Sequence, residues 1–272
     1  MSPLELDQLV RDIGDELQRR LGQPPSVHAC ACGTAVSAPA NGAAPGWAPP
    51  PQGVAGLINQ ALLQADASEE EIRRLCGEAR QYRFGSVCVQ PSRVAAAVRE
   101  LRGTSVKVAA VIGYPHGATL TAVKLAEVAQ VLKLGASELE LTIHPGALKS
   151  GDLDAVYTEI RLTAEGAHAA GAALKVLTEM AALADEQKLI ACALARLGGA
   201  DAVKTSTDLP GSTALASDVA LAHGVVGGEL GIEAAGGVDS YSRFQEMMAA
   251  GATRVATSAG VAIVSQTVTR RG

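Results

Sequence analysis

The chain has 272 residues, 48% of them hydrophobic, and a formal net charge of −5. This length suits one large hydrophobic core, and α/β barrels commonly run to about 250 residues. The acidic balance and an aromatic content of only 3% argue against nucleic-acid binding, which uses basic faces and stacking platforms. We expect no membrane span, because no apolar run reaches roughly 18 residues, and no secretory signal.

The cysteines are odd in number, and their spacing forms no disulfide framework. A reducing, cytoplasmic setting fits this pattern best. Two of them lie close to a histidine, in His28-Ala29-Cys30-Ala31-Cys32, but no second pair of ligands follows at a spacing suited to a metal site. We therefore expect no metal. The five are Cys30, Cys32, Cys76, Cys88 and Cys192.

Residues 2–21 are predicted to form a separate amphipathic helix. Ser2 and Glu5 have capping-box spacing, and Pro3 suits the first helical position. One side of this helix carries charged residues such as Asp15 and Arg19. The other side is an apolar stripe at helical spacing, made of Leu6, Leu9, Val10, Ile13, Leu17 and Leu21.

Residues 22–53 are rich in Ala, Pro and Gly, which predicts a flexible linker because such a stretch buries little apolar surface. A short amphipathic helix on such a linker resembles the encapsulation peptides of enzymes packaged in bacterial microcompartments. That resemblance implies docking of residues 2–21 to shell or cargo proteins, by helix-in-groove recognition, and a microcompartment lumen. Packing against the catalytic domain or self-association is an alternative, and binding to a membrane surface is a third.

Residues 54–272 are predicted to form one α/β domain, in which strand-like runs alternate with helical patterns. One such helix begins after Ser68, a plausible N-cap with Glu71 three residues later. The alternation predicts a parallel (β/α)8 TIM barrel, with a doubly wound sheet as the alternative. The first strand begins at Leu57-Ile58, and the others are expected at 86–89, 106–113, 138–143, 174–179, 202–207, 230–235 and 254–258.

Acids and amines gather on three consecutive predicted strands, whose carboxyl ends meet at one face of a barrel. Side chains alternate along a strand, so every second residue faces the same way. The residues so aligned are Glu138, Glu140, Thr142 and His144, then Lys175 and Glu179, and then Lys204, Ser206 and Asp208.

Lys175 and Lys204 lie within two otherwise apolar strands, although lysine is among the residues least often buried. A lysine can extend its head to water from a strand edge. Two lysines on neighbouring strands favour a chemical role instead. Like charge and desolvation each lower the pKa of an ammonium group, and a neutral lysine amine can attack a carbonyl carbon.

The sequences ALKVLTE (173–179) and DAVKTST (201–207) resemble the two lysine strands of deoxyribose-phosphate aldolases, which are Schiff-base enzymes. Five further matches follow the family's order: FGSVCVQP (84–91), VIGYPHGAT (111–119), GALKSGDLD (146–154), AAGGV (234–238) and ATSAGVAIV (256–264). The resemblance implies a TIM barrel, no cofactor or metal, and carbon–carbon lyase (aldehyde-lyase) activity on 2-deoxy-D-ribose 5-phosphate. It implies that Lys175 forms the imine, that Lys204 lowers its pKa, and that Glu140 donates and accepts protons.

The chain departs from the family at residues close to these three. Glu140 replaces an aspartate, which extends the carboxylate by one methylene, and an ion pair with a lysine is its alternative role. Asn59-Gln60-Ala61 replaces an Asp-His-Thr run, and Glu233-Ala234-Ala235 replaces Lys-Ala-Ser. Gln90 and Ala256 replace an asparagine and a glycine. His144, in place of an asparagine, either restores acid–base capacity or is structural.

A phosphate site is predicted after the last two strands, where TIM barrels often bind phosphate. Gly236, Gly237 and Ser258 would supply backbone N–H groups in loops beside a helix N-terminus. Glycines that only make tight turns are the alternative. The departures also leave two other functions open, namely an aldolase with an altered substrate and a weakly catalytic barrel that acts as a scaffold. A homo-oligomer is compatible with the sequence, which does not decide it.

Overall fold

The computed structural model describes residues 53–207 and 212–269, together with Gln8, Asp12, Asp15, Glu16 and Arg19. These five residues are helical, and four of them interact through their side chains: Gln8 Nε2 donates to Asp12 Oδ1 at 2.8 Å, and Arg19 pairs with Glu16 at 2.9 Å. Apart from them and Gly53, the predicted helix 2–21 and linker 22–53 lie outside the described residues. Cys30, Cys32 and Asp208 also lie outside them.

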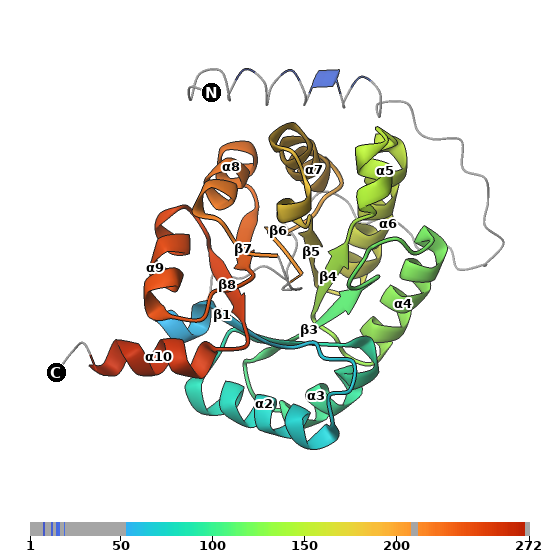
Figure 1. The fold of residues 1–272 in the computed structure, drawn as a ribbon. Coiled ribbons are helices and arrows are strands. Elements are labelled where there is room, and N and C mark those ends of the chain that lie inside the picture. The colour runs from blue at the N-terminus through green and yellow to red at the C-terminus, as the bar shows by residue number, and fades with distance from the viewer. Residues whose placement is uncertain are drawn as a thin grey trace.

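Eight parallel strands close into a barrel in sequential order, and β1 pairs with β8 through Ile58 and Val255. Figure 1 shows the helices arranged around these strands. The predicted TIM barrel is confirmed, and the doubly wound alternative is wrong. The strands are β1 Ile58–Leu62, β2 Ser86–Val89, β3 Lys107–Ile112, β4 Glu138–Thr142, β5 Ala173–Leu177, β6 Ala202–Lys204, β7 Gly231–Ala235 and β8 Arg254–Thr257.

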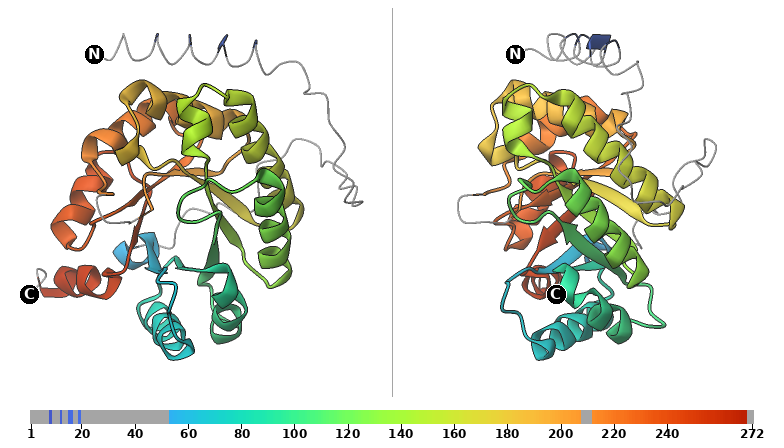
Figure 2. Two further views of the ribbon diagram at one scale, coloured as in Figure 1. Left: turned by 45° about the vertical axis from the view of Figure 1, so that its right-hand side comes forward. Right: turned by 90° about the vertical axis from the view of Figure 1, so that its right-hand side faces the viewer.

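The helices follow the strands and lie outside the barrel, as the two turned views of Figure 2 also show. The helix after β1 begins as predicted, because Ser68 Oγ accepts from the Glu71 N–H and the Ser68 N–H donates to the Glu71 carboxylate at 2.8 Å. The α-helices are α2 Glu69–Tyr82, α3 Val94–Glu100, α4 Thr121–Lys133, α5 Pro145–Lys149, α6 Leu153–Ala169, α7 Asp185–Leu197, α8 Ala216–Val226, α9 Tyr241–Ala249 and α10 Gly260–Thr269; the 3-10 helices are η1 Val54–Leu57, η2 Pro91–Arg93 and η3 Met180–Ala182.

The main hydrophobic core lies between the outer face of the barrel and the helices. Leu139 and Leu141 of β4 and Leu174 and Val176 of β5 belong to it. Residues between them in sequence therefore face the barrel interior, because successive strand side chains point to opposite faces. This alternation places Lys175 and its charged neighbours inside the barrel.

Several strands end earlier than the sequence predicts, and β6 differs most. It ends at Lys204 rather than Thr207, because the Thr207 N–H donates to the Glu179 carboxylate at 2.8 Å instead of continuing the ladder. Within the described part of the chain, no helix is both long and apolar enough to cross a lipid bilayer.

Candidate active site

A cluster of charged side chains occupies the barrel interior, with Lys175 at its centre. The Lys175 Nζ atom lies 2.7 Å from Glu233 Oε2, 2.9 Å from Glu138 Oε2 and 3.1 Å from Glu140 Oε1. All four side chains are 0% exposed. Strands β4, β5 and β7 thus direct one amine and three carboxylates at the same point.

Lys204 and Asn59 each contact both Glu140 and Glu233 and so link these two carboxylates. Lys204 Nζ lies 2.5 Å from Glu140 Oε2 and 3.4 Å from Glu233 Oε1. The Asn59 amide donates to Glu140 Oε1 at 2.8 Å and to Glu233 Oε1 at 3.0 Å. The predicted residues Lys175, Lys204 and Glu140 are therefore brought together. Glu140 also forms the ion pairs that were its alternative role.

Arg254 of β8 completes the charge balance, because its Nη1 atom pairs with Glu138 Oε1 at 2.8 Å. The cluster then contains three cations, Lys175, Lys204 and Arg254, and three carboxylates. Burying an unbalanced charge is costly. The equal numbers therefore allow so many ionisable groups to share one dry interior.

The pKa of Lys175 is opposite in direction to the prediction. Burial lowers it, but the charges of Glu138, Glu233 and Glu140 outweigh burial and hold the pKa well above its usual value. The role of Lys204 in lowering the Lys175 pKa stays a prediction, because in this arrangement the three carboxylates act in the opposite direction. The pKa of Lys204 is also raised, since Glu140 and Glu233 outweigh burial. Conversely, Lys204 and Lys175 outweigh burial and lower the pKa of Glu140.

The part of the interior lined by β2 and β3 is apolar and lies beside Glu140. Cys88, Ala109 and Val111 form a buried cluster on β2 and β3, and Ala61 and Tyr114 pack against it. Burial, followed by the nearby Glu140 charge, raises the pKa of the Cys88 thiol well above its usual value, so the thiol stays protonated. Cys88 is thus a buried thiol in a barrel strand. The barrel interior therefore combines a charged cluster with an adjacent apolar cluster.

Other predicted polar residues hold loops at the carboxyl ends of the strands. The Glu179 carboxylate accepts hydrogen bonds from both the N–H and the hydroxyl of Thr207 and from the Ser212 hydroxyl. Ser206 Oγ donates to the Ala235 carbonyl at 2.6 Å. His144 Nδ1 accepts from the Ala147 N–H at 3.1 Å and caps α5, which is the structural role considered for it.

The predicted phosphate residues follow β7 and β8, which are adjacent strands. Gly236 and Gly237 have φ angles of +105° and +64°, which favour glycine. A Cβ atom at Gly236 would also lie 2.5 Å from the Ser212 carbonyl oxygen. Backbone therefore approaches backbone closely at this loop.

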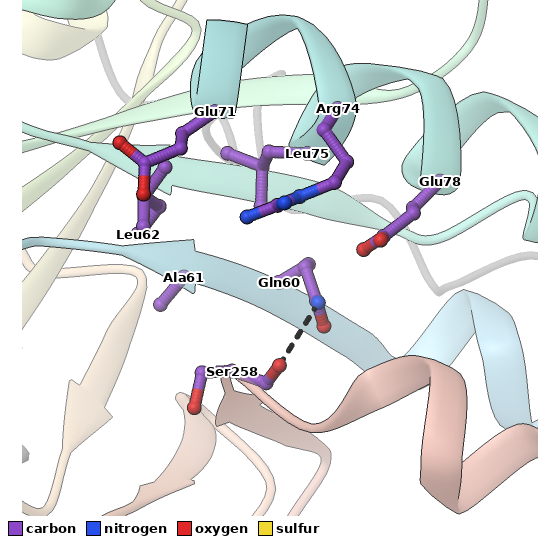
Figure 3. Close-up of a pocket in the computed structure, with 8 residues that line it drawn as sticks. All are labelled: Gln60, Ala61, Leu62, Glu71, Arg74, Leu75, Glu78 and Ser258. Atoms are coloured by element: carbon purple, nitrogen blue, oxygen red, sulfur yellow. Dashed lines mark hydrogen bonds between the residues drawn. The ribbon is translucent and has the colours of Figure 1, made fainter. Parts of the chain in front are cut away.

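Gln60 makes two hydrogen bonds to the segment that joins β8 to α10, and Figure 3 shows one of them. Its Nε2 atom donates to the Ser258 carbonyl at 3.1 Å, and its Oε1 atom accepts from the Gly260 N–H at 2.9 Å. Gln60 and Ser258 also line a cavity of about 410 Å³ that is bounded by β1 and by α2 residues such as Arg74. The loop after β8 is thus tied to the first strand.

A protein-family model described as "DeoC/LacD family aldolase" matches residues 59–267. The chain is 43% identical to the deoxyribose-phosphate aldolase of Aciduliprofundum boonei, over 78% of this chain and 95% of that protein. The chain belongs to the DeoC/LacD aldolase family. The resemblance predicted from the lysine strands is thereby confirmed, and the chain is a lyase of the aldolase type.

Solved structures in this aldolase family share the fold. A putative deoxyribose-phosphate aldolase from Coccidioides immitis superposes with a TM-score of 0.78 at 32% identity, covering 98% of each chain. The deoxyribose phosphate aldolase of Aeropyrum pernix, described as a unique tetramer, gives a TM-score of 0.74 at 27% identity, covering 96% of this chain and 98% of that one.

Three site residues of this aldolase were not assigned a role from the sequence. Glu233 and Asn59 were recognised only as departures from the family, and Arg254 was not singled out. The signal for all three was a charged or amide residue at an inward position of a buried strand. In the part of the chain that the structure describes, no group of three or more His, Cys, Asp or Glu side chains is arranged to hold a metal ion.

Proposed function

We propose that the protein cleaves 2-deoxy-D-ribose 5-phosphate reversibly to acetaldehyde and D-glyceraldehyde 3-phosphate through an imine on Lys175. The observation that carries the proposal is the buried Lys175 amine, which lies within 3.1 Å of three carboxylates inside the barrel. A relative of 43% identity is named a deoxyribose-phosphate aldolase, which supports this substrate.

In the proposed mechanism, the Lys175 amine attacks the aldehyde carbon of the open-chain sugar, and water leaves to give a protonated imine. Glu140 then removes the proton of the hydroxyl on the third carbon, directly or through a water. The bond between the second and third carbons breaks, and its electron pair moves into the imine as an enamine. Protonation of the enamine and hydrolysis of the imine release acetaldehyde.

The surrounding residues have distinct proposed roles. Lys204, paired with Glu140 at 2.5 Å, keeps that carboxylate ionised as a base. The apolar cluster around Cys88 and Val111 accommodates the two-carbon fragment. Backbone N–H groups at Gly236, Gly237 and Ser258 bind the phosphate, in the loops where barrels of this type often hold one. Gln60 supports that loop through its bonds to the backbone on either side of Ala259.

Borohydride trapping tests the proposal. The protein is mixed with 2-deoxyribose 5-phosphate, reduced, digested and mapped by mass. We expect a reduced two-carbon adduct on Lys175 alone, because Lys175 is the amine that forms the imine in the proposed mechanism. No adduct on folded protein would reject this substrate and leave the altered-substrate aldolase or the weakly catalytic scaffold. A panel of other aldehydes and sugar phosphates then separates these two.

We further propose that residues 2–21 dock the enzyme to shell or cargo proteins inside a bacterial microcompartment, with residues 22–53 as a flexible linker to the catalytic domain. The support is the apolar stripe of residues 2–21 opposite a charged side. A homo-oligomer is also proposed, in line with the tetramer described for the Aeropyrum pernix enzyme.

Deleting residues 1–21 from the full chain is expected to abolish sedimentation with purified shells and to leave aldol cleavage unchanged. A charge on the stripe (Leu9→Glu) should act like the deletion, whereas Gln8→Glu on the polar side should not. If the deletion leaves shell binding intact but dissociates an oligomer, measured by light scattering, the helix serves self-association. If neither property changes, the docking proposal is wrong.

A further inference from the structure

The proposed imine chemistry requires Lys175 to lose a proton before it attacks. The three carboxylates around Lys175 favour its charged form, so like charge from Lys204 does not solve this problem. The proton must pass to a group that the amine already contacts. Glu138, Glu140 and Glu233 are the three acceptors within ion-pair distance of the Lys175 Nζ atom.

The second partners of these carboxylates distinguish them. Glu138 pairs with Arg254 at 2.8 Å, and Glu140 pairs with Lys204 at 2.5 Å. Before substrate is attached to Lys175, protonating either carboxylate would remove a close ion pair with a second buried cation, which is costly. In the proposed mechanism Glu140 takes a proton only later, when cleavage of the carbon–carbon bond drives that transfer. Glu233 is different, because its distance to a second cation, Lys204, is 3.4 Å.

Glu233 also makes the shortest contact with Lys175, at 2.7 Å between Oε2 and Nζ. Its other oxygen, Oε1, accepts from the Asn59 amide at 3.0 Å. One oxygen is thus directed at the nucleophile while the other is held in place. A proton can move between these two groups without any side chain changing position.

We propose that Glu233 is a catalytic residue of this enzyme, the base that takes the Lys175 proton when the imine forms and the acid that passes it to the departing hydroxyl. This role rests on the imine chemistry of the proposed function. It also explains a departure from the family, whose members usually carry a lysine at this position and so cannot use it as a carboxylate base.

The proposed step balances. The proton moves from Lys175 Nζ to Glu233 Oε2, and the freed nitrogen lone pair forms the C–N bond while the carbonyl electron pair moves to oxygen. The oxygen takes one of the two remaining nitrogen protons. The proton on Glu233 then passes to this hydroxyl, which leaves as water as the C=N bond forms. The net reaction converts an ammonium group and an aldehyde to a protonated imine and water.

Asn59 fits the same role as a positioning residue. The family usually has an aspartate there, and a second carboxylate 3.0 Å from Glu233 would repel its charge. The asparagine amide instead donates to both Glu233 and Glu140. The departures at residues 59 and 233 therefore form a compatible pair.

The test is the rate of borohydride trapping with acetaldehyde, measured against pH for the wild type, Glu233→Gln and Glu138→Gln. Both variants remove a carboxylate from Lys175, so both lower the pKa of its amine. The other ionisable groups in this interior, Lys204, Arg254, Glu140 and Cys88, are common to all three proteins. Glu138→Gln is therefore a matched control for the loss of charge alone.

We expect the wild type to trap at a rate independent of pH around neutrality, because its proton moves internally. In Glu233→Gln the proton must go to solvent, so the rate should rise about tenfold per pH unit and fall roughly 10²-fold below the wild type near pH 7. Glu138→Gln should keep the flat profile. A flat profile in Glu233→Gln, or trapping as fast as in the wild type, would overturn the proposal.

Glu233→Asp keeps the test decisive if Glu233→Gln is poorly folded by circular dichroism. The aspartate retains the charge balance and the base but moves the oxygen away from Lys175. We expect a flat profile at a reduced rate, and a rate that rises with pH would contradict the proposal. No adduct at any pH in folded wild type would instead overturn the proposed function, and the role of Glu233 with it.

Discussion

Lys175→Met is expected to reduce aldol cleavage by about 10⁴-fold or more, the scale seen when the nucleophile of a covalent catalyst is removed. Methionine fills a similar volume but has no amine, so the imine cannot form. The measurement is release of acetaldehyde from 2-deoxyribose 5-phosphate, followed with a coupled dehydrogenase. Borohydride should leave no adduct on the variant.

The same substitution removes one cation from the buried cluster, so the control must separate chemistry from folding. Lys175→Arg keeps the charge among Glu138, Glu140 and Glu233 but cannot form an imine. We expect it to be as inactive as Lys175→Met and to melt closer to the wild type. Cleavage that survives in both variants would show that another amine, such as Lys204, is the nucleophile.

The departures from the family lie around the Lys175 amine. Glu140 and Glu233 lie far apart in the sequence, yet both contact the Lys175 Nζ atom, and Asn59 donates to both. Each substitution considered alone suggests a damaged site. Glu140 and Glu233 belong to a cluster of three carboxylates and three cations, completed by Glu138, Lys175, Lys204 and Arg254. This balance favours a rearranged catalytic apparatus over a degenerate one.

The strands were predictable because buried parallel strands are short apolar runs, and the inward lysines and glutamates interrupt those runs at every second residue. Barrel closure was not predictable from periodicity alone, because pairing of β1 with β8 depends on residues about two hundred positions apart. The end of β6 was misplaced because Glu179, on another strand's loop, takes the Thr207 N–H.

The residues that form the site were partly predictable from the sequence, whereas the direction of the Lys175 pKa shift was not. Alternation along β4, β5 and β6 placed Glu140, Lys175 and Lys204 inside the barrel. The direction of the Lys175 pKa depends on partners from three strands, including Glu233 on β7, and a pairwise argument from Lys204 could not count them. Gln60 was missed as a loop anchor because its partners, Ser258 and Gly260, are backbone groups that carry no sequence signal.

Arg254→Met is expected to lower the free energy of unfolding by about 3 kcal/mol, the low end of the range for breaking a buried ion pair. The arginine is 4% exposed, and its loss removes the Glu138 pairing at 2.8 Å. Glu138 keeps its contact with Lys175, which limits the cost. Because Arg254 also opposes the rise in the Lys175 pKa, the variant should form the imine more slowly at neutral pH. Urea unfolding and borohydride trapping measure the two effects.

The double variant Glu138→Gln with Arg254→Met separates lost charge balance from lost packing. It removes one charge of each sign, so the cluster is neutral again, and we expect it to recover at least half of the lost stability. The two substitutions should therefore be strongly non-additive in a double-mutant cycle. Additive losses would show that Arg254 stabilises the barrel through its packing, and that charge balance does not hold the interior together.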